Sequence, residues 1–189
     1  MDNKLTWLEK MGIARVGVLA SAVIAAVSGC GGDPQAREYA LPSDLCGTEV
    51  PSELYDGLFP NGSEVEIQES FSAPGPPLYE CEVTVDGNGV IRSGTAAWDD
   101  FEAGIDNFGL PVEIEEGDPV SGTYDARVWP GAAIAQASCP ELGSRGSFMV
   151  YIRAEHPEDE AESKSIMSEL IQPYMAAVVD LIPEYGCES

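Results

Sequence analysis

The sequence predicts an α+β domain, in which an antiparallel sheet has helices packed on one face and two disulfides join distant segments. Three features of the chain lead to this prediction. Short runs of alternating apolar and polar residues are separated by turns rich in Gly, Pro and Asn. A long C-terminal stretch places apolar residues at helical spacing. Four cysteines are spread along the domain, namely Cys46, Cys81, Cys139 and Cys187.

The N-terminal segment, residues 1–29, has the features of an export signal. Lys4, Lys10 and Arg15 form its positive flank, and residues 16–27 supply an uncharged, mostly apolar stretch of 12 residues. A permanent membrane helix needs about 20 apolar residues. We therefore expect a removable signal peptide rather than a membrane span.

The apolar stretch ends in Val27-Ser28-Gly29-Cys30, which is an aliphatic residue, two small residues and a cysteine. This tetrapeptide resembles the lipobox of bacterial lipoprotein precursors, with Val27 in place of the commoner Leu. The resemblance implies that a dedicated peptidase cuts between Gly29 and Cys30, and that the Cys30 thiol carries a diacylglyceryl group. Two acyl chains, at about 0.8 kcal/mol for each buried CH₂, hold a protein to a membrane far better than one. The alternatives are a soluble secreted protein cut nearby and an uncleaved anchor helix.

Cleavage before Cys30 would leave 160 residues, which suits one domain large enough to bury a core. Residues 30–43 begin with a polar Gly-Gly-Asp-Pro run and are expected to form a flexible tether. A single domain is then expected over residues 44–189. Apolar residues make up 44% and charged residues 22% of the chain, which is typical of a globular protein.

The first half of the domain is expected to start with a short helix over residues 51–59, which Pro60-Asn61-Gly62 would stop. A strand follows around Val65 and Ile67, and a second strand contains Cys81. The residues Asp86-Gly-Asn-Gly89 predict a tight hairpin turn, because Gly and Asn tolerate positive φ angles. The partner strand is expected from Val90 toward Ala97.

The second half is expected to contain a short amphipathic helix, strands at 124–129 and 132–139, and a central strand at 148–152, which is almost entirely apolar. The C-terminal segment, residues 158–185, is the clearest helix, with acidic residues near its start where the helix dipole favours them. Pro173 lies inside it, so we expect a kink or two shorter helices. Its apolar stripe is Ile166, Leu170, Tyr174, Val178 and Leu181.

Without Cys30, the cysteines are even in number, which in an exported chain indicates disulfides with three possible pairings. The residues around Cys81 alternate with a period of two, which turns its side chain toward the core. We prefer the pairs Cys46–Cys81 and Cys139–Cys187, because each would join a terminal helix to a strand. Zinc binding would require closely spaced pairs, which the sequence lacks.

The domain is strongly acidic. The chain has 9 Lys and Arg against 33 Asp and Glu, and the part after Gly29 has 6 against 31, a net charge of −25. Such a field repels phosphate backbones and anionic lipid heads, so we expect no nucleic-acid partner. It attracts cations or basic proteins, although the simpler interpretation is a solvated surface.

Several candidate motifs fail when their positions are checked. Residues 84–95 imitate a calcium-binding loop, but Thr84 and Thr95 occupy the positions that require carboxylates. His156 is the only histidine and has no nucleophile in a recognisable arrangement. Lys164 is the only lysine after the leader and lies among acidic residues, so we do not expect it to act as a nucleophile. We therefore expect no catalytic residue, no bound metal and no cofactor other than the lipid on Cys30.

Two features leave alternatives open. Carboxylates cluster at three places, and such clusters could hold Ca²⁺ or flank a sugar bond in a cell-wall hydrolase, although an acidic chain forms clusters without purpose. An apolar stripe at helical spacing could line a ligand groove or pack in the core. The clusters are Asp99/Asp100/Glu102/Asp106, Glu113/Glu115/Glu116/Asp118 and the acids from Glu155 to Glu162; the stripe is Trp98, Phe101, Ile105 and Phe108.

The lipobox, the Leu45-Cys46-Gly47 start, the strand cysteine and the closing Tyr185-Gly186-Cys187 together resemble small cysteine-paired lipoproteins of actinobacteria. Most proteins of that class have no known function, and some resemble modules that bind cell wall or small ligands. The resemblance implies a lipid-anchored module on the outer face of the cell membrane. We expect it to be non-enzymatic and to bind an envelope protein, a wall polymer or a small ligand. The alternatives are a carboxylate-dependent wall hydrolase and a calcium-binding structural lipoprotein.

Overall fold

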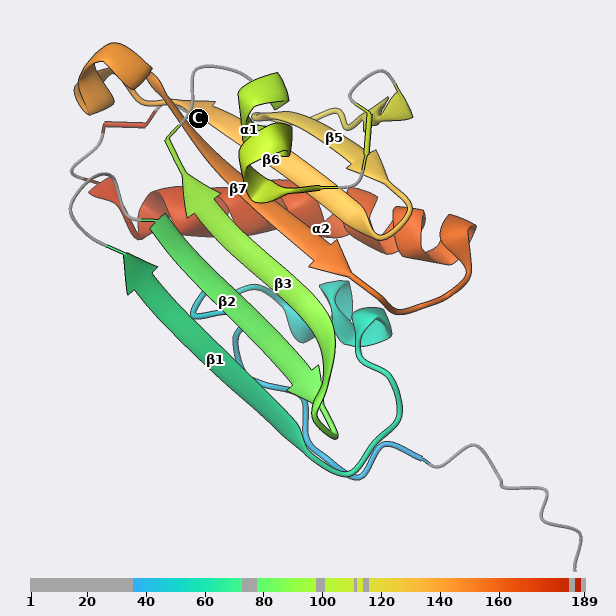
Figure 1. Cartoon of the computed structure of the whole chain (residues 1–189). Coiled ribbons are helices and arrows are strands. Elements are labelled where there is room, and N and C mark those ends of the chain that lie inside the picture. Colours follow the sequence, from blue (N-terminus) through green and yellow to red (C-terminus); the bar gives the residue numbers. More distant parts are fainter. Residues whose placement is uncertain are drawn as a thin grey trace, which may run out of the picture. The chain divides into compact units, whose positions relative to one another are not determined.

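The computed structural model describes residues 36–72, 78–97, 101–110, 112–113, 116–183 and 186–187. Within these residues, seven strands form one sheet in the order β1-β2-β3-β7-β6-β5-β4, and all neighbours are antiparallel (Figure 1). The strands are β1 (Val65–Ser72), β2 (Leu78–Val85), β3 (Asn88–Ala96), β4 (Asp118–Pro119), β5 (Asp125–Trp129), β6 (Ala132–Ser138) and β7 (Ser147–Ala154). The predicted α+β fold with an antiparallel sheet and disulfides is confirmed.

The main core lies on one face of the sheet. In β2, the buried residues Cys81, Val83 and Val85 alternate with the exposed Glu80 and Glu82, so one face of the strand packs inward. The long helix α2 (Glu160–Asp180) covers this face and buries, among others, Met167, Leu170, Ile171, Tyr174 and Met175. The central strand β7 is buried over Phe148–Ile152, as its apolar run predicts.

The short helix α1 (Phe101–Phe108) lies on the opposite face of the sheet from α2 (Figure 1). Its Phe101 and Ile105 pack with Trp129, Met149 and Tyr151 in a second, smaller core. The described residues of the apolar stripe therefore pack in a core rather than line a groove. Trp98 lies outside the described residues. The structure thus adds a helix on the second face to the predicted arrangement, because the outward side chains at this end of the sheet are also apolar.

The hairpin between β2 and β3 turns at Asp86 and Gly87, which have φ angles of 50° and 77°. Two positive φ angles in a two-residue loop are characteristic of a type I′ turn, which matches the twist of the strands. The Asp86 carboxylate accepts hydrogen bonds from the backbone of Ser63 and Glu64 and from the Ser63 hydroxyl. These hydrogen bonds lower the pKa of Asp86 and join the turn to the start of β1. The hairpin prediction for this segment is confirmed.

Two helix predictions need correction. The segment predicted as a helix over residues 51–59 forms two 3₁₀ turns, η1 (Ser52–Leu54) and η2 (Asp56–Leu58), because Tyr55 departs from helical geometry between them. Of the two outcomes expected at Pro173, a kink or two shorter helices, the second is not found, because the described helix α2 is continuous from Glu160 to Asp180. Buried neighbours on both sides of Pro173 hold this helix against the sheet despite the lost hydrogen bond.

The folded part begins before the predicted boundary at Asp44. The Arg37 guanidinium pairs with Asp56 and donates to the Phe59 carbonyl oxygen at 2.6 Å, and the Tyr39 hydroxyl donates to the Pro60 carbonyl oxygen at 2.5 Å. Residues 37–43 therefore belong to the packed unit rather than to the expected tether of residues 30–43. Residues 34–189 form one compact unit with its own core and disulfides, so this domain can be studied without the preceding segment.

Candidate functional site

The described residues contain two disulfides, Cys46–Cys81 and Cys139–Cys187. These are the pairs that the sequence favoured. Cys46–Cys81 ties the N-terminal segment to β2, whereas Cys139–Cys187 ties the end of β6 to the segment beyond α2. Gly29 and Cys30, the expected cleavage and lipidation residues, lie outside the described residues.

Cys46 lies at the tip of a tight turn. Leu45 and Thr48 exchange two backbone hydrogen bonds of 3.0 and 3.1 Å, and the residues between them, Cys46 and Gly47, have φ angles of 55° and 68°. The Asp44 carboxylate accepts a hydrogen bond from the Gly47 amide at 3.0 Å. Positive φ is costly for a cysteine. The disulfide and the Asp44 hydrogen bond therefore help to hold the turn in this shape.

A pocket of about 280 Å³ opens beside this turn, between the C-terminal end of α2 and the inner face of the sheet. Its apolar walls are Phe148 from β7, Val178 from the end of α2, and Leu181 and Ile182 just beyond that helix. Its polar side chains are Thr48, Glu69, Tyr79, Thr95 and Tyr174. Sites for small molecules have this composition, with mostly apolar walls and a few polar groups. They usually measure about 300–1,000 Å³, so this pocket lies just below the small end of the range. The pocket is therefore the right kind of site for a small ligand.

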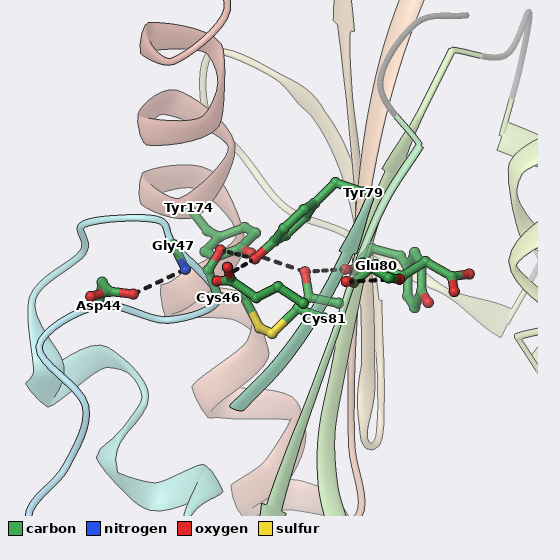
Figure 2. Close-up of a disulfide and its surroundings, with 11 residues drawn as sticks. Asp44, Cys46, Gly47, Tyr79, Glu80, Cys81 and Tyr174 are labelled. Atoms are coloured by element: carbon green, nitrogen blue, oxygen red, sulfur yellow. Dashed lines mark hydrogen bonds between the residues drawn. A yellow bond between two sulfur atoms is a disulfide. The ribbon is translucent and has the colours of Figure 1, made fainter. Parts of the chain in front are cut away.

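The Tyr79 hydroxyl connects the strand side of the pocket to the disulfide turn. Figure 2 shows the Tyr79 side chain beside the Cys46–Cys81 disulfide. The hydroxyl lies 2.7 Å from the Cys46 carbonyl oxygen and 2.9 Å from Glu69 Oε1. Both neighbours are acceptors, so the hydroxyl must keep its proton to bond either of them. Burial and the hydrogen bond to Glu69 raise the pKa of Tyr79 far above 10.0. Tyr79 is therefore a neutral hydrogen-bond donor at physiological pH.

Tyr174 reaches from α2 toward the sheet beneath the pocket. Its hydroxyl lies 2.9 Å from Ser93 Oγ, which donates to the Tyr151 carbonyl oxygen at 2.9 Å. Since Ser93 donates to that carbonyl, Tyr174 donates to Ser93. Burial raises the pKa of Tyr174, and Thr48 also hydrogen-bonds its hydroxyl. This buried chain fixes α2 against the sheet directly under the candidate site.

The pocket carries negative charge without an ionic partner. The carboxylates of Glu69 and Asp44 both raise the pKa values of Tyr79 and Tyr174, which places the two charges near the pocket. In the part of the chain that the structure describes, neither carboxylate forms an ion pair. The basic residues of the described ion pairs, Arg37, Arg92, Arg153 and Lys164, bind Asp56, Glu80, Glu155 and Asp118 instead.

The cysteines and tyrosines of the pocket are not in a reactive form. Its thiols are joined in a disulfide and its two tyrosines are protonated, so neither type of group is an activated nucleophile. His156 lies between β7 and α2 and does not line the pocket, and Lys164 is paired with Asp118 at 2.5 Å.

The acidic clusters that the sequence pointed to do not converge in the described structure. Among the described residues, no group of three or more His, Cys, Asp or Glu side chains could hold a metal ion. The first two clusters are only partly described, because Asp99, Asp100 and Glu115 lie outside the described residues. The Asp86 carboxylate of the calcium-loop imitation is engaged by Ser63 and Glu64.

The sequence did not predict the pocket, although Tyr79 lies in a strand and Tyr174 in a helix as expected. Cys46 lies in a tight turn rather than at the expected terminal helix. No sequence pattern marked Glu69 or Thr95 as pocket residues, because their strands are far along the sequence from the end of α2 that completes the site. The one available signal was Leu181. The sequence assigned it to the buried stripe of the helix, but it follows the last residue of α2 and is 61% exposed.

Comparison of the chain with known protein families, with curated proteins and with solved structures found no match. A search of the described helices found none that is long and apolar enough to cross a bilayer.

Proposed function

We propose that the protein is an exported lipoprotein, anchored through lipid on Cys30 to the outer face of the cell membrane. Its domain would act there as a non-enzymatic binding module. The lipobox supports the anchor, and the oxidised state of the other four cysteines supports export, because disulfides persist outside the reducing cytoplasm.

The pocket beside the Cys46–Cys81 disulfide is the observation that carries the binding role. It combines exposed apolar surface at Leu181 with a few polar side chains, among them Glu69 and Tyr79. The proposed ligand is a small molecule with an apolar body, because the walls are apolar and the volume is small.

Membrane fractionation of the Cys30→Ala variant tests the anchor. We expect the wild-type chain in the membrane fraction, and the variant to lose both lipid and processing before residue 30. The matched control is Ser28→Ala, which keeps a small residue in the lipobox and should leave fractionation unchanged. A Cys30→Ala variant that is still processed at the same bond and still found with the membrane would refute the anchor.

A further inference from the structure

We infer that the pocket beside Cys46–Cys81 selects a small cation with an alkyl chain, such as a primary alkylammonium ion. This inference rests on the proposed function and specifies the chemistry of its ligand. The chain of such an ion would contact Phe148, Val178, Leu181 and Ile182, and its ammonium group would meet Glu69.

The negative charge at the pocket favours a ligand with a cationic head group. Glu69 lines the pocket, and Asp44 stands behind the turn that forms one of its sides. Neither has an ionic partner in the described residues, since the described ion pairs all involve other carboxylates. The chain has 33 acidic and 9 basic residues, so the wider field has the same sign. An anionic head group at this position would meet like charge at short range.

The hydrogen bonds at the pocket leave Glu69 available to a ligand. The Tyr79 hydroxyl is closer to the Cys46 carbonyl oxygen, at 2.7 Å, than to Glu69 Oε1, at 2.9 Å. Tyr79 can therefore keep its bond to Cys46 while Glu69 accepts from an ammonium group. The Glu69 side chain is also exposed, so an incoming cation can reach it without a rearrangement of the core.

The apolar wall favours a cation with an alkyl chain, because a metal ion or a bare ammonium ion would leave that wall exposed to water. Leu181 is 61% exposed and contacts the pocket at the mouth, where only an alkyl chain would remove it from water. The volume of about 280 Å³ limits the ligand to a short chain. Affinity should therefore rise with chain length, by about fourfold for each added methylene, until the pocket is filled.

Calorimetric titration of the oxidised domain of residues 34–189 tests this inference. The probes are butyl-, hexyl- and octylammonium, with octanoate and 1-octanol as controls of matched chain length. We expect octylammonium to bind at least about tenfold more tightly than octanoate, because like charges repel at the pocket. Added salt should narrow this difference by screening the carboxylates.

Two variants distinguish the contribution of the Glu69 carboxylate to binding from that of the apolar wall. Glu69→Gln should weaken octylammonium binding by about two- to fivefold and leave 1-octanol binding unchanged, because only the cation uses the carboxylate. Glu66→Gln is the matched control, since Glu66 lies on the same strand with its side chain on the opposite face. Leu181→Ala should weaken both ligands, and its exposed position keeps the fold intact.

Three outcomes would overturn the inference, and they are distinguishable. If octanoate or 1-octanol binds as tightly as octylammonium, the selection of a cation is wrong while the proposed binding role stands. If Glu66→Gln weakens octylammonium as much as Glu69→Gln does, the effect is that of net charge and the site is not Glu69. If no probe binds, both the selection of a cation and the proposed small-ligand role of this pocket are wrong.

Discussion

The turn at Cys46 and Gly47 shows how single residues shape the candidate site. Gly47 has a φ of 68°, and a Cβ atom added there would lie 3.3 Å from Glu69 Oε1 and 3.5 Å from the Tyr79 hydroxyl oxygen. The residue thus provides both the positive φ angle that the turn requires and room for the two polar groups of the pocket. A side chain at this position would disturb the hydrogen bonds that join β1 and β2 to the turn.

We predict that Gly47→Ala lowers the free energy of unfolding by about 1–3 kcal/mol, through strain at positive φ and crowding of Glu69. Gly87→Ala is the matched control, because Gly87 has a φ of 77° but no atom within 4 Å of the added Cβ. The control should cost only about 1–2 kcal/mol. Urea unfolding of both variants measures the difference, and equal losses would show that the crowding at Gly47 has no effect.

At the scale of elements, helix α2 passes through Pro173 without a break. An interior proline lacks the N–H that would bond the Glu169 carbonyl oxygen, and its ring crowds the preceding turn. The buried Ile171, Tyr174 and Met175 around it nevertheless hold the helix on the sheet. Packing on the sheet therefore outweighs the local preference of the proline.

We predict that Pro173→Ala raises the free energy of unfolding by about 1–2 kcal/mol. The penalty of about 3 kcal/mol for an interior proline would be relieved. The greater freedom of alanine in the unfolded chain offsets about 1 kcal/mol of this gain. Thermal and urea unfolding would measure the change. A lower stability would show instead that the helix needs the proline geometry to fit the sheet.

Elements that depend on local patterns could be predicted from the sequence. The alternation around Cys81, the Asp86-Gly87 turn and the apolar run of β7 each follow from a few neighbouring residues. The packing of Arg37 against Asp56 and Phe59 could not be predicted, because it depends on a contact between distant segments. The pocket could not be predicted either, because it forms where the end of α2 meets Glu69 and Tyr79 from distant strands.

At the scale of the domain, the buried tyrosines make the stability of the fold depend on pH. Burial raises the pKa of Tyr39, Tyr55, Tyr79, Tyr124, Tyr151 and Tyr174 above the ordinary value of 10.0. The unfolded chain would release these protons near pH 10, whereas the folded chain would still hold them. The folded state is therefore favoured by these groups below pH 10 and loses that advantage as the pH rises further.

We predict that the free energy of unfolding falls steeply above pH 10, by at most about 1.4 kcal/mol per pH unit for each buried tyrosine. The Tyr79→Phe variant should be less stable at neutral pH, because the Cys46 carbonyl oxygen loses its donor, but should show a shallower decline above pH 10. Denaturant unfolding between pH 7 and pH 11 measures both effects. An identical alkaline slope in the variant would show that Tyr79 titrates normally in the folded domain.

The central claim, an exported lipid-anchored domain with an oxidised interior, is tested most directly by the intact mass of protein extracted from membranes. The account predicts a chain that starts at Cys30, carries a diacylglyceryl group there, and has no free thiol because Cys46–Cys81 and Cys139–Cys187 are closed. An unprocessed chain without added lipid, or free thiols at these four positions, would contradict it.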